Sequence, residues 1–262
     1  MEKRIELRSE HLLRDRQYLA NDSIVYQINE DKQSATVYKS GYHITEAIIA
    51  SEVVIEGKVY PVNSISSSAF CERSKLTHVE IPESVTIIGY CAFEKCIGLT
   101  SIILPDSVEE IEFHAFRDCT NLREIVIPNS VKEIGGYTFK GCSELTHIEI
   151  PNSMTSIYCF QDCTGLTHIE IPDSVTRIGD KAFSGCSSLK HIEIPNSVRE
   201  IRDYAFFDCQ SLTTITLPDS VTEIGVYIFG GCTSLKTVIV PANKKDFFKE
   251  LLPEVSCIEF KY

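Results

Sequence analysis

The chain has 262 residues, of which 43% are hydrophobic and 24% are charged, and its formal net charge is −12. Binding to nucleic acid requires clustered Lys and Arg that displace counterions, and because no such stripe is visible, we expect no nucleic-acid partner. No stretch approaches the roughly 20 apolar residues of a membrane helix, which predicts no membrane insertion, and no apolar signal-peptide core follows Met1. The chain as given is therefore predicted to be cytoplasmic, with the cell surface or secretion as the alternative if a leader has been removed.

Residues 1–43 are predicted to form an N-terminal arm and a capping hairpin. The leucines before Asp22 fall at roughly helical spacing, which favours a short amphipathic helix or a loosely held arm. From Ile24 to Tyr38, apolar and polar residues alternate on both sides of a polar turn, which is typical of a β-hairpin. Such a hairpin would cover the open edge of the first coil of the region that follows.

A repeated pattern fills residues 44–240. One copy runs from Leu166 to Leu189 and reads LTHIEIPDSVTRIGDKAFSGCSSL, and close copies stand on both sides of it. Each copy contains a proline after two apolar residues spaced as Ile-x-Ile. These prolines are 23 residues apart, except for one step of 21 after Pro151: Pro82, Pro105, Pro128, Pro151, Pro172, Pro195, Pro218 and Pro241. A fixed period in this range predicts a solenoid, here of about eight coils, because one repeat cannot bury its apolar face alone and neighbours must stack.

Within each copy, the pattern Leu-x-x-Ile-x-Ile predicts a strand whose last two apolar residues share a face. Equivalent strands of successive coils would pair in parallel, roughly 4.8 Å apart. The proline ends each strand because it lacks an amide donor. The copy that follows Pro151 is two residues short between Ile157 and Phe160. We expect a local kink there, and a neutral deletion in a surface turn is the alternative.

Residues 241–262 are predicted to form a C-terminal cap, made of a helix and a last strand. Asn243 is the expected N-cap of the helix and Pro253 its expected stop. The apolar residues of the segment fall on one helical face: Phe247, Phe248, Leu251 and Leu252. The strand is expected between Val255 and Phe260. A cap is needed because the terminal coil of a solenoid would otherwise expose apolar surface, whereas a partner site is the alternative use of this helix.

The full pattern, L-x-x-I-x-I-P-x-S-V-x-x-I-G-x-x-A-F-x-x-C, resembles the BspA-like, Treponema pallidum type of leucine-rich repeat. The resemblance implies a leucine-rich repeat solenoid of the α/β class, rich in β-structure. It places a parallel β-sheet on the concave face, short turns and strands on the convex face, and a cap at each end. It also implies a bacterial protein-binding scaffold, because relatives are often bacterial or protist surface proteins that engage host matrix proteins or other cells. The fold alone does not identify a partner.

The cysteines form a second pattern. Seven of the eleven follow a Phe by three residues: Cys96, Cys119, Cys142, Cys163, Cys186, Cys209 and Cys232. We predict that this column is a buried ladder of structural thiols, and its odd number suits a reducing compartment. Four more lie off register, and one of them can be reactive if it is exposed: Cys71, Cys91, Cys159 and Cys257. No C-x-x-C occurs, so the spacings of zinc and thioredoxin sites are absent.

A His-Ile-Glu triplet recurs in three consecutive coils, with His78-Val-Glu80 as an outlying copy. The candidate partner-binding residues are His147, Glu149, His168, Glu170, His191 and Glu193. Residues at i and i+2 of a strand share a face, so stacking predicts a solvent-facing patch with a column of His beside a column of Glu. This patch would lie on the concave sheet, which is the usual binding surface of a solenoid.

Three interpretations of the patch remain open. Exposed polar residues copied along with the repeat need no further explanation. A docking patch of neutral His and acidic Glu would favour a basic protein and weaken as imidazole protonates below roughly pH 6.5. A divalent metal site would use competent ligands, but a flat array offers neither a closed cage nor an outer shell. We expect no metal and no cofactor.

An enzyme is not expected. The Ser and Cys columns are used by turns and core, the histidines lie on an open sheet, and neither a Gly-rich phosphate loop nor H-E-x-x-H occurs. The predicted function is a non-catalytic protein–protein interaction scaffold that binds a protein partner through the concave sheet. Adhesion to host matrix or neighbouring cells is the first alternative, and a purely structural spacer is the second.

Overall fold

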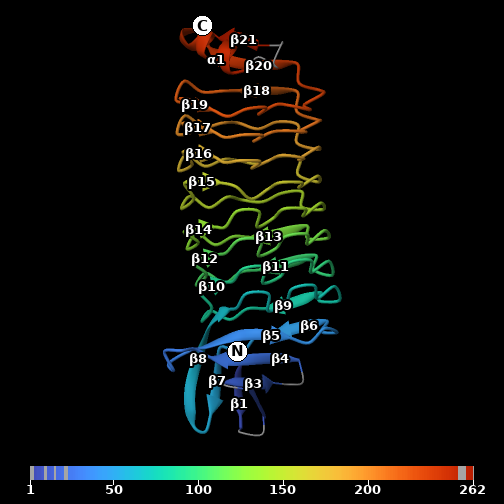
Figure 1. Cartoon of the computed structure of the whole chain (residues 1–262), viewed down its shortest axis with the longest axis vertical. Coiled ribbons are helices and arrows are strands. Elements are labelled where there is room, and N and C mark those ends of the chain that lie inside the picture. The colour runs from blue at the N-terminus through green and yellow to red at the C-terminus, as the bar shows by residue number, and fades with distance from the viewer. Residues whose placement is uncertain (1–2, 9–10, 15, 21–22, 253–257, 262) are drawn as a thin grey trace. The chain divides into compact units, whose positions relative to one another are not determined.

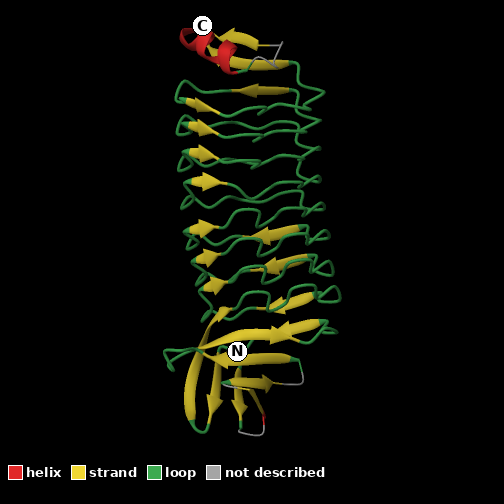
Figure 2. Cartoon of the chain, in the orientation of Figure 1, coloured by secondary structure: helices red, strands yellow, loops and turns green. Residues whose placement is uncertain are grey.

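The chain divides into two compact units, Met1–Thr138 and Phe139–Tyr262, which we call the amino-terminal and carboxy-terminal units. The computed structural model (Figure 1) describes residues 3–8, 11–14, 16–20, 23–252 and 258–261. Strands and turns make up almost all of both units (Figure 2), and the described helical segments are confined to residues near 11 and 242–251. Repeated coils stacked through parallel strands confirm the predicted leucine-rich repeat solenoid.

The first strands of the amino-terminal unit correct the predicted helix or loose arm. They are β1 (Arg4–Leu7), β2 (Leu12–Arg14), β3 (Gln17–Ala20), β4 (Ile24–Ile28) and β5 (Ala35–Ser40). Neighbours from β2 to β5 pair antiparallel, with Tyr18 opposite Tyr26 and Leu19 opposite Val25. Cross-strand packing with β4 therefore overrides the helical spacing of the leucines. The predicted hairpin is confirmed as β4 and β5.

The change from antiparallel to parallel pairing takes place at β8 (Lys58–Ile65). β7 (Glu52–Ile55) and β8 form an antiparallel hairpin, whose turn residues Glu56 and Gly57 have positive φ. β5 lies parallel to the other edge of β8. β8 is then the first member of a parallel ladder, because its Ile65 pairs with Ile88 of the next coil.

Two parallel ladders hold the coils together, and we name them by their sequence position. The first ladder uses the Ile-x-Ile strands: β6 (Glu46–Ile48), β9 (His78–Glu80), β11 (Ser101–Ile103), β13 (Glu124–Val126), β18 (Thr214–Thr216), β20 (Thr237–Pro241) and β21 (Ile258–Lys261). The second ladder uses two-residue strands later in each coil: β10 (Ile87–Ile88), β12 (Glu110–Ile111), β14 (Glu133–Ile134), β15 (Ser156–Ile157), β16 (Arg177–Ile178), β17 (Glu200–Ile201) and β19 (Glu223–Ile224). Where strands of a ladder pair, each residue lies opposite the equivalent residue of a neighbouring coil; the first ladder pairs β6 with β9, β11 with β13, and β20 with both β18 and β21.

The core of the coils contains a column of phenylalanine rings and, from Cys96 onward, a column of cysteine thiols. In the amino-terminal unit, the rings of Phe70, Phe93 and Phe116 stack at centroid distances of 5.1 and 5.4 Å. The thiol of Cys96 donates a hydrogen bond to the carbonyl oxygen of Phe70, one coil earlier, at 3.0 Å. Cys119, Cys163, Cys186, Cys209 and Cys232 repeat this contact. The predicted cysteine ladder is confirmed, and every described cysteine is a thiol.

The turns use two left-handed backbone positions in most coils. The first precedes the Ala-Phe or equivalent pair, and its occupants are Ser68, Cys91, His114, Tyr137, Lys181, Tyr204 and Tyr227. The second precedes the column cysteine or its equivalent, and its occupants are Glu72, Lys95, Asp118, Gly141, Asp162, Gly185, Asp208 and Gly231. A non-glycine residue in this conformation costs roughly 1–2 kcal/mol, which Gly avoids and Asp tolerates best.

The short coil lacks the first of these turns. Between Ile157 and Phe160 the backbone runs without turn or positive φ. The ring of Tyr158 lies where the Cβ of any larger residue at Gly179 would be, so this glycine is required by close approach. The kink that we predict there is not tested by these contacts.

The C-terminal cap contains the short helix α1 (Lys245–Leu251), preceded by a 3₁₀ turn over Ala242–Lys244. The predicted N-cap is wrong: the residue before α1 is Lys244, and the Asn243 amide instead donates to Asp219 at 3.2 Å. Phe248 and Leu252 are buried, as the helical face predicts. β21 pairs parallel with β20, which confirms a last strand. Pro253, Val255 and Cys257 lie outside the described residues, and the boundaries at 43 and 240 stay predictions.

Candidate functional site

The predicted patch lies on three successive coils of the carboxy-terminal unit. Its residues alternate with Ile148, Ile169 and Ile192, whose exposed fractions are 1%, 1% and 0%. The outward side chains are all solvent-exposed: His147, Glu149, His168, Glu170, His191 and Glu193. We call these six residues the His–Glu face. The structure therefore brings together all six residues that the sequence predicts.

Each histidine faces the glutamate of its own coil. The distance from His Nε2 to Glu Oε1 is 4.0 Å at His147, 3.7 Å at His168 and 3.4 Å at His191. The glutamate side chains are nearly fully exposed, at 87%, 90% and 88%. Pairs this open to solvent contribute little to stability and leave their carboxylates accessible.

The backbone beneath the His–Glu face differs from the predicted sheet. Residues 147–150 and 168–171 are outside any strand, and Glu193 makes a single bridge with Thr216. Between these coils, the bond from the Lys190 amide to the Thr167 carbonyl is 3.4 Å. On the second ladder, the amide of Gly179 lies 2.8 Å from the carbonyl of Ile157. The first ladder is thus opened where the patch lies, while the second ladder remains intact.

A hollow opens between each pair of neighbouring coils on this face. One is lined by His147, Ile148, Glu149, Ile150, Asn152, Glu170, Ile171, Pro172 and Asp173. The other is lined by His168, Ile169, Glu170, Ile171, Asp173, Glu193, Ile194, Pro195 and Asn196. Both combine carboxylates with isoleucine and proline, and neither lining includes Lys or Arg. The same chemistry is therefore presented twice, one coil apart.

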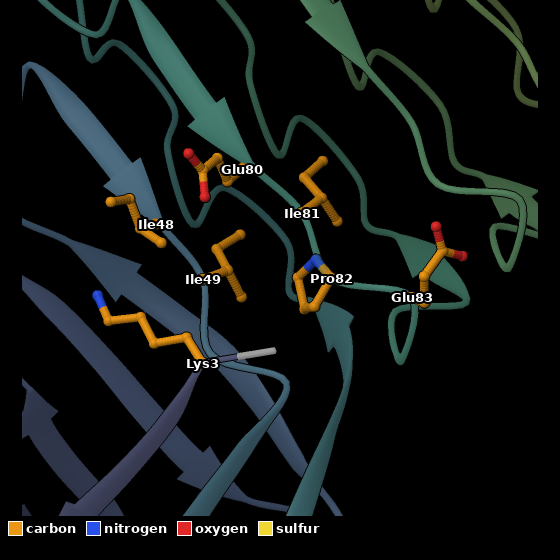
Figure 3. Close-up of a pocket in the computed structure, with 7 residues that line it drawn as sticks. All are labelled: Lys3, Ile48, Ile49, Glu80, Ile81, Pro82 and Glu83. Atoms are coloured by element: carbon orange, nitrogen blue, oxygen red, sulfur yellow. The ribbon is translucent and has the colours of Figure 1, made fainter. Parts of the chain in front are cut away.

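The outlying copy, His78 and Glu80, lies in the amino-terminal unit and has a different setting. Its side chains are 3.3 Å apart on β9, which pairs with β6. The hollow beside it (Figure 3) is lined by Lys3, Ile48, Ile49, Glu80, Ile81, Pro82 and Glu83. Lys3 brings a cation to this hollow, which the repeat pattern does not predict because Lys3 precedes the repeats. This copy is thus not equivalent to the His–Glu face.

Metal binding and thiol chemistry find no support in the described residues. Within them, no group of three or more His, Cys, Asp or Glu side chains is placed to hold a metal ion. Burial raises the pKa of Cys91 and of Cys159 to about 12, and burial also raises the pKa of Cys71, so these thiols stay protonated at neutral pH. A reactive off-register cysteine is therefore not found among these three, and Cys257 lies outside the described residues.

No membrane-spanning segment is found among the described helices, since none is long and apolar enough.

Comparison with known proteins gives one family and several solved structures. A model described as BspA type leucine rich repeat region (6 copies) matches residues 63–158 and 156–260. A leucine-rich repeat protein from T. pallidum is 29% identical, with a TM-score of 0.59, over 89% of this chain and 95% of that chain. A leucine-rich cell surface protein from Faecalibacterium prausnitzii A2-165 is 21% identical, with a TM-score of 0.45, over 94% of this chain and 95% of that chain. No curated protein matches the sequence.

Proposed function

Because the chain belongs to the BspA-type leucine-rich repeat family, we propose that it is a non-catalytic scaffold that binds a protein partner through the His–Glu face. The observation that carries the proposal is the repetition of one hollow between successive coils. A repeated site suits an extended protein segment, which presents equivalent side chains at regular intervals. Solenoids use such open faces for binding.

The chemistry of the hollows favours a basic partner. Each hollow includes three carboxylates, and Glu170 and Asp173 are common to both. The isoleucines and prolines of the lining suit the methylene stems of Lys and Arg, whose charged heads would reach the carboxylates. The formal net charge of −12 would also steer a basic partner toward the protein.

The cysteine ladder supports a reducing compartment as the place of action. Every described cysteine is a thiol, and disulfides persist mainly in oxidising compartments. We therefore favour a cytoplasmic partner. Adhesion at the cell surface, to host matrix or to neighbouring cells, is the alternative, and the source of the captured partner separates the two.

The test is a capture experiment with the full chain, from cell lysate and from extracellular matrix. A variant with all six residues of the His–Glu face changed to Ala is compared with the parent. The matched control carries His78→Ala and Glu80→Ala, the same residue types in the amino-terminal unit. We expect the parent and the control to retain a basic protein that the folded six-residue variant loses.

Two results would contradict the proposal. Equal capture by the parent and by the six-residue variant would remove the His–Glu face from recognition. Capture of nothing by any version, with all versions folded, would favour a structural spacer.

A further inference from the structure

The two left-handed turn positions of the coils hold different kinds of residue. The second position holds Asp or Gly in most coils, as expected for residues that tolerate positive φ. The first position holds no Gly, Asn or Asp in any coil. In the carboxy-terminal unit it holds Lys181, Tyr204 and Tyr227, with φ of 57°, 58° and 53°. The chain thus keeps large side chains at a backbone position that disfavours them, which points to a role for the side chains.

These side chains already make one contact between a cation and a ring. The Lys181 ammonium lies over the Tyr204 ring, 5.9 Å from its centroid. Tyr204 in turn stacks on Tyr227, with centroids 5.8 Å apart and planes at 19°. An ammonium or guanidinium group over an aromatic face is attracted by the negative face of the ring. The contact between Lys181 and Tyr204 therefore shows that a ring of this column can hold a cation over its face.

Tyr227 is the last ring of this column. It makes its ring contact with Tyr204, and 56% of the residue remains exposed. Val226 beside it is 54% exposed, so the ring and an aliphatic side chain form one open surface. The formal net charge of −12 favours a positively charged partner at such a surface.

We propose that Tyr227 and Val226 form a docking site for a Lys or Arg side chain of a basic protein segment. The cation stacks on the open face of Tyr227, in the way that Lys181 stacks on Tyr204, and its methylene stem packs on Val226. The site lies on the turns after the second ladder, and none of its residues belongs to the His–Glu face.

Stacking of the rings for stability alone is the competing explanation, and substitutions at Tyr227 separate the two. Tyr227→Gly removes the ring and also suits the left-handed backbone. A ring kept for docking predicts that the midpoint of thermal unfolding stays the same or rises. A ring kept only for stacking predicts that this midpoint falls.

Binding is measured by calorimetry with the full chain and a pair of peptides. One peptide alternates Gly and Arg, and the other replaces each Arg by citrulline, which keeps the shape and removes the charge. We expect Tyr227→Leu, which keeps apolar volume, to reduce the preference for the Arg peptide over the citrulline peptide roughly two- to fivefold. Phe113→Leu is the matched control, because Phe113 is an aromatic residue of similar exposure, 53%, in the amino-terminal unit.

The proposal is overturned if Tyr227→Leu leaves the preference for the Arg peptide unchanged, or if Phe113→Leu reduces it equally. A fall in the unfolding midpoint of Tyr227→Gly, together with unchanged peptide preference in Tyr227→Leu, would assign the ring to stacking. Loss of preference in Tyr227→Leu with the His–Glu face intact would support the site whatever the outcome of the capture experiment.

Discussion

The first ladder is paired at β6–β9 and at β11–β13 in the amino-terminal unit but unpaired at residues 147–150 and 168–171 in the carboxy-terminal unit, although both have the same Ile-x-Ile pattern. In the closed part, Ile103 of β11 lies opposite Val126 of β13, and both point outward, with exposed fractions of 76% and 64%. At the same outward position, the open part has Glu149, Glu170 and Glu193. Aliphatic side chains opposite each other stabilise a strand pair, whereas like charges opposite each other destabilise it. We therefore expect the outward residues to influence whether the strands of the first ladder pair.

The spacing of the core rings also differs between the two units. Phenylalanine ring centroids lie 5.1 and 5.4 Å apart in the amino-terminal unit and between 5.6 and 5.8 Å apart in the carboxy-terminal unit. The second ladder is present in both units. Opening of the first ladder is thus tolerated because the second ladder and the core column still join the coils.

Removing a core ring should have the largest effect and should act within its own unit. Phe183→Ala in the carboxy-terminal unit and Phe93→Ala in the amino-terminal unit each delete a ring that stacks on both sides. We expect each to reduce the free energy of unfolding by about 3–5 kcal/mol. Hydrogen exchange should show faster exchange mainly in the unit that carries the change. Equal loss of protection in both units would show that they do not respond separately.

Alkaline pH should weaken the thiol-containing core of each unit. Burial raises the pKa of the Cys96 thiol to about 12, and burial also raises the pKa of Cys186. Because the unfolded chain loses these protons near the ordinary pKa of 9, stability is full below pH 9 and falls as pH rises toward 12, by about 1.4 kcal/mol per pH unit for each such thiol.

Limited proteolysis between pH 8 and 11 would locate the first cleavages of this alkaline transition. We expect them in the carboxy-terminal unit, because its first ladder is open. Cleavage that begins in the amino-terminal unit would contradict this expectation.

Exchanging the outward residues should strengthen strand pairing on the first ladder in the carboxy-terminal unit and weaken it in the amino-terminal unit. Glu170→Val removes the central charge of the open part, and we expect a gain of about 0.2–1 kcal/mol with slower hydrogen exchange at residues 169–171. Val126→Glu is the reciprocal change and should weaken the β11–β13 pair by a similar amount. If both variants exchange like the parent, the outward side chains do not control the ladder.

We expect the smallest effect from the loss of an ion pair on the second ladder, which is paired in both units. The Arg177 guanidinium contacts Glu200 through two hydrogen bonds, at 2.7 and 2.9 Å, and lowers the pKa of that carboxyl below its ordinary value near 4.5. Its contribution is present above that ordinary pKa and is lost as pH falls through the lowered one.

Arg177→Gln should therefore lower the unfolding midpoint slightly at pH 7 and still less at pH 3. A loss as large as that of Phe183→Ala would mean that the second ladder depends on this pair. Arg199→Gln, on the next coil, is the matched control.

Much of the fold could be predicted from the sequence because the same residue pattern recurs in successive copies, so that several copies indicate each contact. The 23-residue period indicates the coils, and the cysteine that follows one phenylalanine of each full copy by three residues indicates the buried thiols. The strands before Asp22 could not be predicted, because β3 is fixed by pairing with β4 and its own pattern is too short to decide.

The candidate site could be predicted only in part. The alternation around Ile148, Ile169 and Ile192 indicates which side chains share a face. The unpaired backbone at residues 147–150 and 168–171 is a property of neighbouring coils together, which no single copy contains. The ring column of Tyr204 and Tyr227 was missed because its signal is a backbone conformation rather than a residue type, although tyrosine recurring 23 residues apart was visible.

The short coil affects which coil of the carboxy-terminal unit stacks on which during folding. Near-identical coils carry almost no information about which should stack on which, so a coil displaced by one period would bury nearly the same residues. The coil with Tyr158 differs from the other described coils. It alone among them lacks the first left-handed turn, and the ring of Tyr158 lies against Gly179 of the coil that follows. A displaced alignment would bring Tyr158 against Arg202, whose side chain occupies the position of Gly179 one coil later. We therefore expect the short coil to favour one alignment of the more uniform coils of the carboxy-terminal unit over alignments displaced by one period.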